Sequence, residues 1–387
     1  MRLLMLDNEF PPLGGGMGTA NEALLRRFAH QPDLEIDVIT AALGGRAEVV
    51  QFAERIRLFK VPVWNRNIHH STNRELLLYT AQALPLALRL HMRRRYDRCF
   101  AWSAVPAGAV ALALRRLVGL PYLVWVSGPD IPGFEQRYAR VYPLLIPALR
   151  RIWRQATPLV AKCADEITMI HAVDPAVPVV MIPNGVDLAA FKPGPPTPDD
   201  GPLEIVCVAR LIERKGQHHL IEAVQRLTAE GVAVRLKLVG TGDSQQDYEA
   251  LAERLGVAAQ VQFAGYVPRE AIAAEYAAAH VFALPSFCEG MSVAALEAMG
   301  AGLPVVLSRT GGTAELLDDG VQGLSFDWAD VTTLTAHLRR LATDRALARR
   351  MGAAARERAL RFSWDAIADS YLDLLTPPRT QLLPAGQ

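Results

Sequence analysis

Short apolar runs alternate with amphipathic stretches along the whole chain. The runs that predict strands in the first half are Leu3–Leu6, Ile36–Ile39, Arg57–Val61, Arg98–Trp102, Tyr122–Val126 and Glu166–Met169. Those of the second half are Glu204–Val208, Arg235–Val239, Val261–Ala264, Val281–Leu284 and Pro304–Leu307. Helical patterns fall between them, at Asn21–Ala29, Gln217–Ala229, Asp247–Leu255 and Val331–Leu341. This alternation predicts an α/β protein with parallel sheets, and the two series predict two doubly wound domains.

Composition narrows the class of protein. The chain has 387 residues, 51% of them hydrophobic and 21% charged, which fits packed domains rather than disorder. Its formal charge of +1 argues against a dedicated nucleic-acid binder. The four cysteines lack metal-ligand spacing, so we expect reduced thiols and a cytoplasmic location. The longest uncharged run, 99–114, contains a proline and a glycine and is too short for a bilayer span.

Two glutamates eight residues apart mark the most informative segment, which follows the strand Val281–Leu284. A tight loop leads into a helix that we expect to begin near Ser292 and to end at Gly300 and Gly302. Glu289 then lies just before the helix N-terminus, and Glu297 lies on the helix.

The N–H groups of Gly290, Met291 and Ser292 lie between the two carboxylates. Unpaired donors and the helix dipole make such a position an anion site. Carboxylates flanking a phosphate-sized site suit a nucleotide sugar, which is phosphate in the middle and polyhydroxyl at both ends. Acids near a helix start are also common for structural reasons alone.

Two further loops have a phosphate-binding character. Gly14, Gly15 and Gly16 belong to Phe10-Pro-Pro-Leu-Gly-Gly-Gly-Met-Gly18, which joins the first strand to the first helix. This loop is neither a dinucleotide fingerprint nor a Walker A loop, and a tight turn is the alternative explanation. Arg210 lies just beyond the carboxyl end of the strand Glu204–Val208, where open α/β sheets bind ligands, and Lys215 lies at the start of the next helix. Surface charge is the alternative explanation for both residues.

These segments together resemble the retaining glycosyltransferases of family 4, with their E-x7-E motif, P-P-x-G-G-x-G loop and paired Arg and Lys. The resemblance covers nearly the whole chain and is most specific at 204–216 and 281–315. It implies a GT-B fold, in which two doubly wound Rossmann-like domains face each other across a cleft.

The resemblance also moves the domain boundary. Composition alone places it in the proline-rich loop 192–202, whereas Ile182-Pro-Asn-Gly-Val-Asp187 usually opens the second domain of this family. We therefore predict a first domain of residues 1–177, completed by a C-terminal helix at about 363–387 with Ser363 as its N-cap, and a second domain of residues 178–362.

The resemblance assigns roles to the motif residues. Arg210 and Lys215 hold the donor diphosphate, Glu289 contacts the donor sugar, and Glu297 contacts the ribose. The loop Gly14–Gly16 faces the diphosphate, and Val267 lies in a loop that offers backbone groups to the base. Gly242 belongs to a strand-end turn that is explained equally well as a plain turn, and Glu315 in the matching loop 310–315 is expected to be structural.

No Asp-x-Asp occurs in the chain, so we expect no metal or other cofactor. Arg210, Lys215 and helix-end N–H groups would then stabilise the leaving diphosphate, a form of catalysis that contributes about a hundred- to a thousand-fold per donor group.

One motif departs from the family pattern. Relatives often have His-Gly-x-Asp near the reacting carbon, and this chain has Ser127-Gly-Pro-Asp130. Asp130 becomes the preferred polar contact there, with a buried helix-cap aspartate as the alternative.

Two features point toward the acceptor. The segment His69-His70-Ser-Thr-Asn-Arg74 precedes an apolar helix and is a hypothetical acceptor site. Basic clusters at Arg89–Arg98 and Arg137–Arg154, interleaved with apolar residues, suit either solvated helix faces or peripheral contact with the inner face of a membrane.

The sequence therefore predicts transfer of a hexose or N-acetylhexosamine from a UDP- or GDP-sugar, with retention, to a glycan, lipid-linked or small-molecule acceptor in glycoconjugate or cell-surface polysaccharide synthesis. A nucleotide-sugar epimerase or phosphorylase on the same fold is one alternative. A non-catalytic sugar-nucleotide-binding relative is the other.

Overall fold

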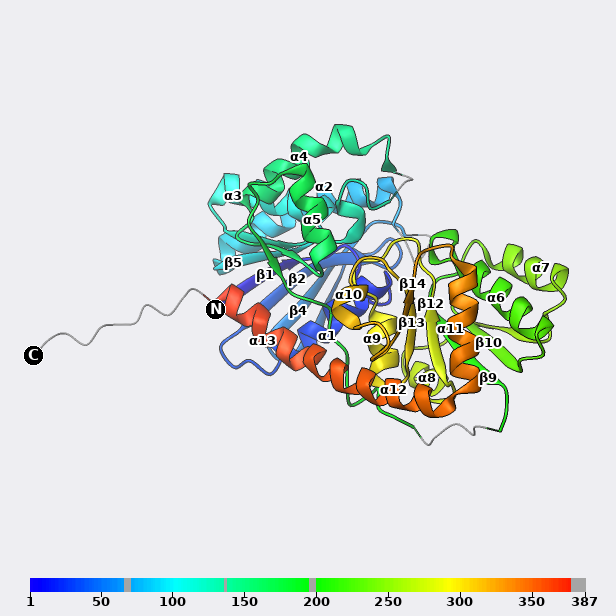
Figure 1. The fold of residues 1–387 in the computed structure, drawn as a ribbon. Coiled ribbons are helices and arrows are strands. Elements are labelled where there is room, and N and C mark those ends of the chain that lie inside the picture. Colours follow the sequence, from blue (N-terminus) through cyan, green and yellow to red (C-terminus); the bar gives the residue numbers. More distant parts are fainter. Residues whose placement is uncertain (66–70, 136–137, 195–199, 377–387) are drawn as a thin grey trace, which may run out of the picture. The chain divides into compact units, whose positions relative to one another are not determined.

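The computed structural model describes residues 1–65, 71–135, 138–194 and 200–376, and it divides into two compact units (Figure 1). Unit 1 comprises Met1–Pro183 and the C-terminal segment that begins at Trp364, and unit 2 is Asn184–Ser363. The first boundary therefore lies after Pro183 rather than after residue 177. The reason is β8 (Val179–Met181), which pairs in parallel with β7 (Leu159–Ala161) and so completes the first sheet.

Unit 1 is an eight-stranded sheet with the order β3-β4-β2-β1-β5-β6-β7-β8, parallel except where β3 runs antiparallel to β4. Its remaining strands are β1 (Arg2–Leu6), β2 (Glu35–Ala42), β3 (Glu48–Ala53), β4 (Ile56–Pro62), β5 (Arg98–Trp102) and β6 (Tyr122–Trp125). Its helices are α1 (Gly16–Phe28), α2 (Asn73–Arg94), α3 (Ala109–Val118), α4 (Tyr142–Gln155), α5 (Ala164–Val173) and α13 (Trp364–Leu375).

The last helix belongs to the core of unit 1, although the whole of unit 2 precedes it in the sequence. Helix α13 packs against α1, and its Tyr371 is 2% exposed. The Tyr371 ring lies 5.4 Å from that of Phe100, which stacks at 4.7 Å on Trp102. The predicted return of the chain to the first domain is thus observed as far as Leu375, and residues 377–387 lie outside the described part.

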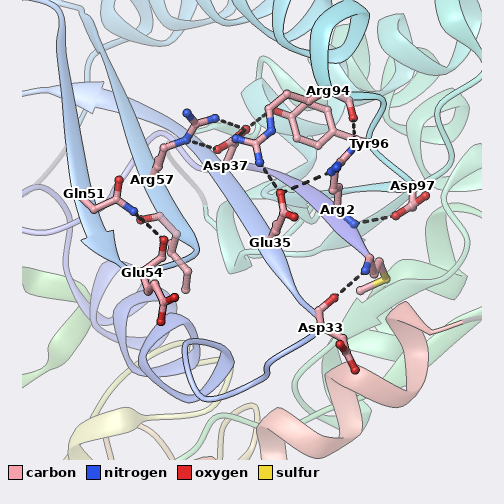
Figure 2. A network of polar contacts seen from close by, with 12 residues as sticks. Arg2, Asp33, Glu35, Asp37, Gln51, Glu54, Arg57, Arg94, Tyr96 and Asp97 are labelled. Carbon is pink, nitrogen blue, oxygen red and sulfur yellow. Dashed lines mark hydrogen bonds and ion pairs between the residues drawn. The ribbon is translucent and has the colours of Figure 1, made fainter.

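Charged and polar side chains near the amino-terminal ends of strands in the first sheet form a network of contacts (Figure 2). Asp37, two residues into β2 and 2% exposed, accepts two hydrogen bonds from Arg57 of β4, at 2.9 and 3.1 Å. Arg94 and Tyr96 also contact the Asp37 carboxylate. These residues lie toward the amino-terminal ends of parallel strands, the edge opposite to the one where such sheets bind ligands. We therefore infer that this network stabilises unit 1 and takes no part in ligand binding.

Unit 2 is a six-stranded, all-parallel sheet with the order β11-β10-β9-β12-β13-β14. Its strands are β9 (Leu203–Val208), β10 (Val234–Val239), β11 (Val261–Gly265), β12 (Val281–Leu284), β13 (Val305–Ser308) and β14 (Gly323–Phe326). Its helices are α6 (Gln217–Ala229), α7 (Gln245–Arg254), α8 (Ile272–Ala277), α9 (Val293–Gly300), α10 (Thr313–Leu316), α11 (Val331–Thr343) and α12 (Arg345–Ala359).

One predicted strand is wrong. Residues Glu166–Met169 lie in helix α5, and the strand is the short β7 just before it. The Glu166 carboxylate reaches back to accept a hydrogen bond from the Lys162 backbone at 2.8 Å, which fixes the first turn of the helix. A run of four residues contains too little periodicity to separate a strand from a helix.

Candidate active site

The loops that follow β9, β12 and β13 are joined at the carboxyl edge of the second sheet. The backbone carbonyl of Arg214, after β9, accepts a hydrogen bond from the Phe287 N–H at 2.8 Å. The Arg214 side chain donates through Nη1 to the Cys288 carbonyl at 3.0 Å. Ser308, at the end of β13, donates its hydroxyl to the Ser286 carbonyl at 2.6 Å. The loop that contains Glu289 is therefore held from both sides by neighbouring loops.

Glu289 and Lys215 form an ion pair in this loop cluster. The side chains are only 16% and 15% exposed, and the Ser286 hydroxyl donates a second hydrogen bond to Glu289 Oε1 at 2.7 Å. The two residues are 74 positions apart, and Gly216 makes their approach possible. Gly216 has φ +68°, and a Cβ at this position would lie 2.1 Å from the Pro285 carbonyl oxygen.

The environment keeps Glu289 ionised. Burial by itself raises the pKa of this carboxyl group. The positive charges of Lys215 and Arg214, with hydrogen bonds from Lys215 and Ser286, outweigh burial and hold the pKa below its ordinary value. Glu289 is thus a fixed hydrogen-bond acceptor, as contact with sugar hydroxyls requires.

The predicted helix start is confirmed. Ser292 is the N-cap of α9, and its hydroxyl accepts a hydrogen bond from the Ala295 N–H at 3.2 Å. Among the described residues, none accepts from the N–H groups of Gly290, Met291 and Ser292. Asn184 holds the loop by donating to the Met291 carbonyl at 2.9 Å. The N–H groups are therefore available to an anion at the N-terminus of this helix.

A second glycine contact supports the same loop. Gly311, after β13, has φ +48°, and a Cβ there would lie 1.7 Å from the Glu289 carbonyl oxygen. The adjacent Gly312 donates its N–H to the Gly290 carbonyl. The loop 310–315 thus supports Glu289, and the Glu315 carbonyl accepts from Arg358 at 3.2 Å, which agrees with a structural role.

Glu297 is more deeply buried on α9, with 8% of its side chain exposed. Tyr276 donates its hydroxyl to Glu297 Oε2 at 2.9 Å, and Arg269 contacts Oε1 at 3.4 Å. Burial raises the pKa of Glu297, and the charge of Arg269 with the hydrogen bonds from both partners opposes that rise. Arg269 comes two residues after Val267, so this loop reaches the region of Glu297 through a side chain that the sequence did not single out.

Arg210 is half-buried and lies two residues after the end of β9, and its carbonyl accepts a hydrogen bond from Gln217 Nε2 at 2.8 Å. The turn after β10 packs on this segment: the Leu211 N–H donates to the Thr241 carbonyl at 3.0 Å. A Cβ at Gly242 would lie 2.2 Å from the Leu211 carbonyl oxygen. Close backbone packing thus accounts for Gly242, which favours the plain-turn explanation and makes the turn a support for Arg210.

The loops that follow β12 and β13 line a pocket of about 10 Å³. Its polar lining comes from Glu289, Gly290, Ser292, Ser308, Thr310 and Thr313. A cavity of this size holds about one water molecule. Any larger ligand would therefore lie on the loops rather than within this pocket.

The glycine loop of unit 1 contains glycines of two kinds. A Cβ at Gly14 (φ +89°) would lie 2.8 Å from Glu9 Cβ, and one at Gly18 would lie 2.8 Å from the Leu13 carbonyl oxygen. A Cβ at Gly15 would meet no atom within 4 Å. Gly16 is the first residue of α1. Packing thus explains Gly14 and Gly18, whereas Gly15 leaves open space at a helix N-terminus.

Asp7 is a titratable residue at this edge that sequence reasoning missed. It is 1% exposed, directly follows β1, and accepts from the Glu9 N–H at 2.9 Å and from the Asn21 side chain. Burial raises its pKa to about 7, against the lowering effect of these two hydrogen bonds. A polar residue at a strand's carboxyl end, just before a glycine loop, was the available signal.

Asp130 adopts the arrangement of the alternative explanation, a buried cap. Its carboxylate accepts from the Ala104 and Val105 N–H groups at 2.8 and 3.2 Å, and from the Ser127 N–H and hydroxyl at 3.0 and 2.9 Å. Burial raises its pKa, and these hydrogen bonds oppose the rise. Both carboxylate oxygens are engaged inside unit 1, so the geometry favours a tethering role over direct contact with the reacting carbon.

The histidines of the hypothetical acceptor segment, His69 and His70, lie outside the described residues. The described part of that segment is a helix start: Thr72 caps α2, and its N–H donates to the Glu75 carboxylate at 2.7 Å. Across the described ranges no cluster of three His, Cys, Asp or Glu side chains is arranged to hold a metal ion. The helices of those ranges also include none with the length and hydropathy of a membrane span.

Two α/β domains with largely parallel sheets, each with loops at the carboxyl ends of its strands, are the architecture of the GT-B fold. Two family models identify the class of enzyme: "Glycosyltransferase Family 4" matches residues 14–190, and "Glycosyl transferases group 1" matches residues 191–358. The chain belongs to the group 1 glycosyltransferases and is an enzyme of that class.

Curated relatives are glycosyltransferases. The chain is 28% identical to the GDP-mannose-dependent alpha-(1-6)-phosphatidylinositol monomannoside mannosyltransferase of Mycolicibacterium smegmatis, over 97% of this chain and 99% of the relative. It is 32% identical to the D-inositol 3-phosphate glycosyltransferase of Geodermatophilus obscurus, over 60% of this chain and 55% of the relative.

Solved structures share the fold. Sucrose-phosphate synthase from Thermosynechococcus elongatus has a TM-score of 0.81 at 22% identity, covering 97% of this chain and 98% of that one. Anabaena HepE in complex with UDP-glucose has a TM-score of 0.74 at 20% identity, covering 97% and 99%.

Proposed function

We propose that the enzyme transfers a hexose or N-acetylhexosamine from a UDP- or GDP-sugar, with retention of configuration, to a glycan, lipid-linked or small-molecule acceptor in glycoconjugate or cell-surface polysaccharide synthesis. The observation that carries the proposal is the Lys215–Glu289 ion pair beside the available N–H groups of Gly290, Met291 and Ser292. Here a cation, a helix N-terminus and an ionised carboxylate are neighbours in one loop cluster.

Each part suits one part of a nucleotide sugar. Lys215, Arg210 and the helix-end N–H groups would bind the diphosphate and stabilise the charge that develops when it leaves. Glu289, held ionised, would accept hydrogen bonds from the sugar hydroxyls, and Glu297 from the ribose. Attack on the same face of the sugar, with the leaving phosphate accepting the acceptor's proton, would preserve configuration. These cations would make a metal ion unnecessary.

GDP-mannose is the first donor to test, because the mycobacterial relative that spans 97% of this chain is GDP-mannose-dependent. The experiment is a thermal-shift panel of GDP- and UDP-sugars with EDTA and with Mg²⁺. A donor at about a hundred times its Kd stabilises by about 2.7 kcal/mol. Equal protection with EDTA by one nucleotide class supports the proposal. Absence of protection by every donor would contradict it, and protection only with Mg²⁺ would contradict metal independence.

A matched pair of variants tests the site itself. Lys215→Met should abolish protection by the donor. Lys237→Met removes the cation of another partly buried ion pair of the same unit, Lys237–Glu275, and should leave protection intact. Incubation of the enzyme with donor alone, followed by product analysis, separates transfer from epimerisation. Donor binding without turnover on any acceptor would favour the non-catalytic alternative.

We extend the proposal to contact with an anionic membrane through the end of α2. Arg89, Arg93 and Arg95 are exposed there beside Met92, which is 61% exposed. The second basic cluster suits this role less well, because Arg150 and Arg154 of α4 hydrogen-bond to Val173 and Asp174. The test is flotation with anionic vesicles at low salt, in which Arg89→Glu/Arg93→Glu should reduce co-migration.

A further inference from the structure

Lys162 is a buried cation with a specific set of contacts inside unit 1. It directly follows β7, and 5% of the residue is exposed. Its Nζ lies 2.6 Å from Glu166 Oε1, donates to the Val126 carbonyl at 2.8 Å, and lies 4.3 Å from the centre of the Trp125 ring. A charge at this depth carries a desolvation cost that only such close partners offset.

Through the Val126 carbonyl, the Lys162 ammonium group contacts the end of the neighbouring strand β6. Val126 directly follows β6, and its N–H donates to the Val160 carbonyl of β7 at 2.9 Å. The turn Ser127–Asp130 begins at the next residue. Lys162 and β7 thus hold the peptide groups on both sides of Val126, immediately before that turn.

The turn Ser127–Asp130 is itself hydrogen-bonded to the segment that follows β5. The Asp130 carboxylate accepts hydrogen bonds from the N–H groups of Ala104 and Val105. The residue before them, Ser103, has φ +126°. A non-glycine residue rarely adopts such a φ, and strained residues of this kind persist where the surrounding structure enforces them. Lys162, the turn and the strained segment therefore connect the carboxyl ends of three adjacent strands, the edge where parallel α/β sheets bind ligands.

We propose that Lys162 is a positioning residue for glycosyl transfer: through the Val126 carbonyl it fixes the turn Ser127–Asp130, and through Asp130 the segment Ser103–Val105. This inference rests on the proposed function, in which this turn occupies the place of the family's histidine segment. Stability alone does not require the ion pair, because a buried pair replaced by neutral residues of similar volume is often as stable. What distinguishes Lys162 is that its buried ammonium group donates a hydrogen bond to one particular acceptor, the Val126 carbonyl.

The test compares two double substitutions in the full chain. Lys162→Met/Glu166→Gln removes the ammonium without leaving a buried charge unpaired, a problem that Lys162→Met alone would have. The control, Arg154→Met/Asp174→Asn, removes another ion pair of unit 1 that does not touch Val126. The measurements are Tm, amide hydrogen exchange of segments 103–108 and 127–131, and kcat and KM for transfer.

The positioning role predicts a Tm near that of the wild type for the Lys162 double variant. It predicts about ten- to a hundredfold faster exchange in both segments, the effect of losing a hydrogen bond to a charged group. It also predicts a loss of about a hundredfold in kcat, as expected for reacting groups displaced by about 1 Å, with donor KM unchanged. The control should match the wild type in exchange and kcat.

Wild-type exchange in both segments together with wild-type kcat in the Lys162 double variant would overturn the inference. The same holds if the control variant shows equal losses, because the effect would then be a general loss of stability. If the wild-type enzyme transfers no sugar, the proposed function fails. The exchange data would still decide whether Lys162 orders the two segments.

Discussion

Replacing Gly216 with alanine tests whether the Lys215–Glu289 pair depends on the close approach of two loops. Two effects follow from the structure. Alanine at φ +68° carries a conformational cost of about 1–2 kcal/mol. The new Cβ would also lie 2.1 Å from the Pro285 carbonyl oxygen, so the loops must separate by about 0.9 Å to reach 3.0 Å.

Gly231→Ala isolates the first effect. Gly231 has φ +76°, in the same unit, and a Cβ there would meet no atom within 4 Å. We expect Gly231→Ala to lower the free energy of unfolding by about 1–2 kcal/mol and to leave donor affinity unchanged. Gly216→Ala should be less stable than that, and its kcat/KM should fall by about a hundredfold, because a displacement of about 1 Å at the reacting groups has that effect.

Chemical denaturation measures the free energy of unfolding, calorimetric titration with donor measures affinity, and initial transfer rates give kcat/KM. If Gly216→Ala matched Gly231→Ala in stability, affinity and rate, the approach of Gly216 to Pro285 would not organise the site. The reasoning that connects this glycine to the ion pair would then be refuted.

Three further predictions concern buried polar groups. Asp7→Asn should stabilise the protein increasingly from about pH 4 to pH 7, by up to about 4 kcal/mol, because folded Asp7 keeps its proton to a pKa of about 7 while the unfolded chain releases it near 3.8; a stability difference independent of pH would contradict this. Asp37→Ala should destabilise by about 1.5–3 kcal/mol, the range for hydrogen bonds to a charged group, since Tyr96 and the partly exposed Arg57 lose their acceptor, with donor affinity unchanged; unfolding curves and titrations check both. Tyr276→Phe should weaken donor binding by about 1 kcal/mol and raise the pKa of Glu297 further, so a donor titration whose affinity matches the wild type would count against a nucleoside contact.

Much of the second half of the fold was predictable from the sequence. The predicted helix Gln217–Ala229 and strand Val281–Leu284 have the observed bounds, because each is a long periodic or fully buried run between clear turn residues. Strands β3, β7, β8 and β14 were missed. Strand β3 is largely exposed on the edge of its sheet, and β7 and β8 have only three residues each, so the period-two pattern is weak in all three.

The candidate site was predicted as a set of residues but not as a set of contacts. Glu289 and Lys215 were identified from their loops, yet the ion pair joins residues 74 positions apart and depends on two backbones touching at Gly216. Arg269 and Tyr276 were not identified, because a surface-type arginine and a helical tyrosine carry no local sign of a shared carboxylate partner. Asp130 was predicted as the polar contact near the reacting carbon, with a buried cap as the alternative, and only its four hydrogen bonds favour the cap over a catalytic group.

The return of helix α13 to unit 1 imposes an order on biosynthesis. A ribosome releases the strands of the first sheet early, but the helix that supplies Trp364 and Tyr371 to its core emerges only after all of unit 2. Unit 2 is one continuous segment and has its complete set of core residues before that point. The first half of the chain to be translated is therefore the last to be completed. A nascent chain stalled before residue 364 would contain a complete unit 2 and an incomplete unit 1.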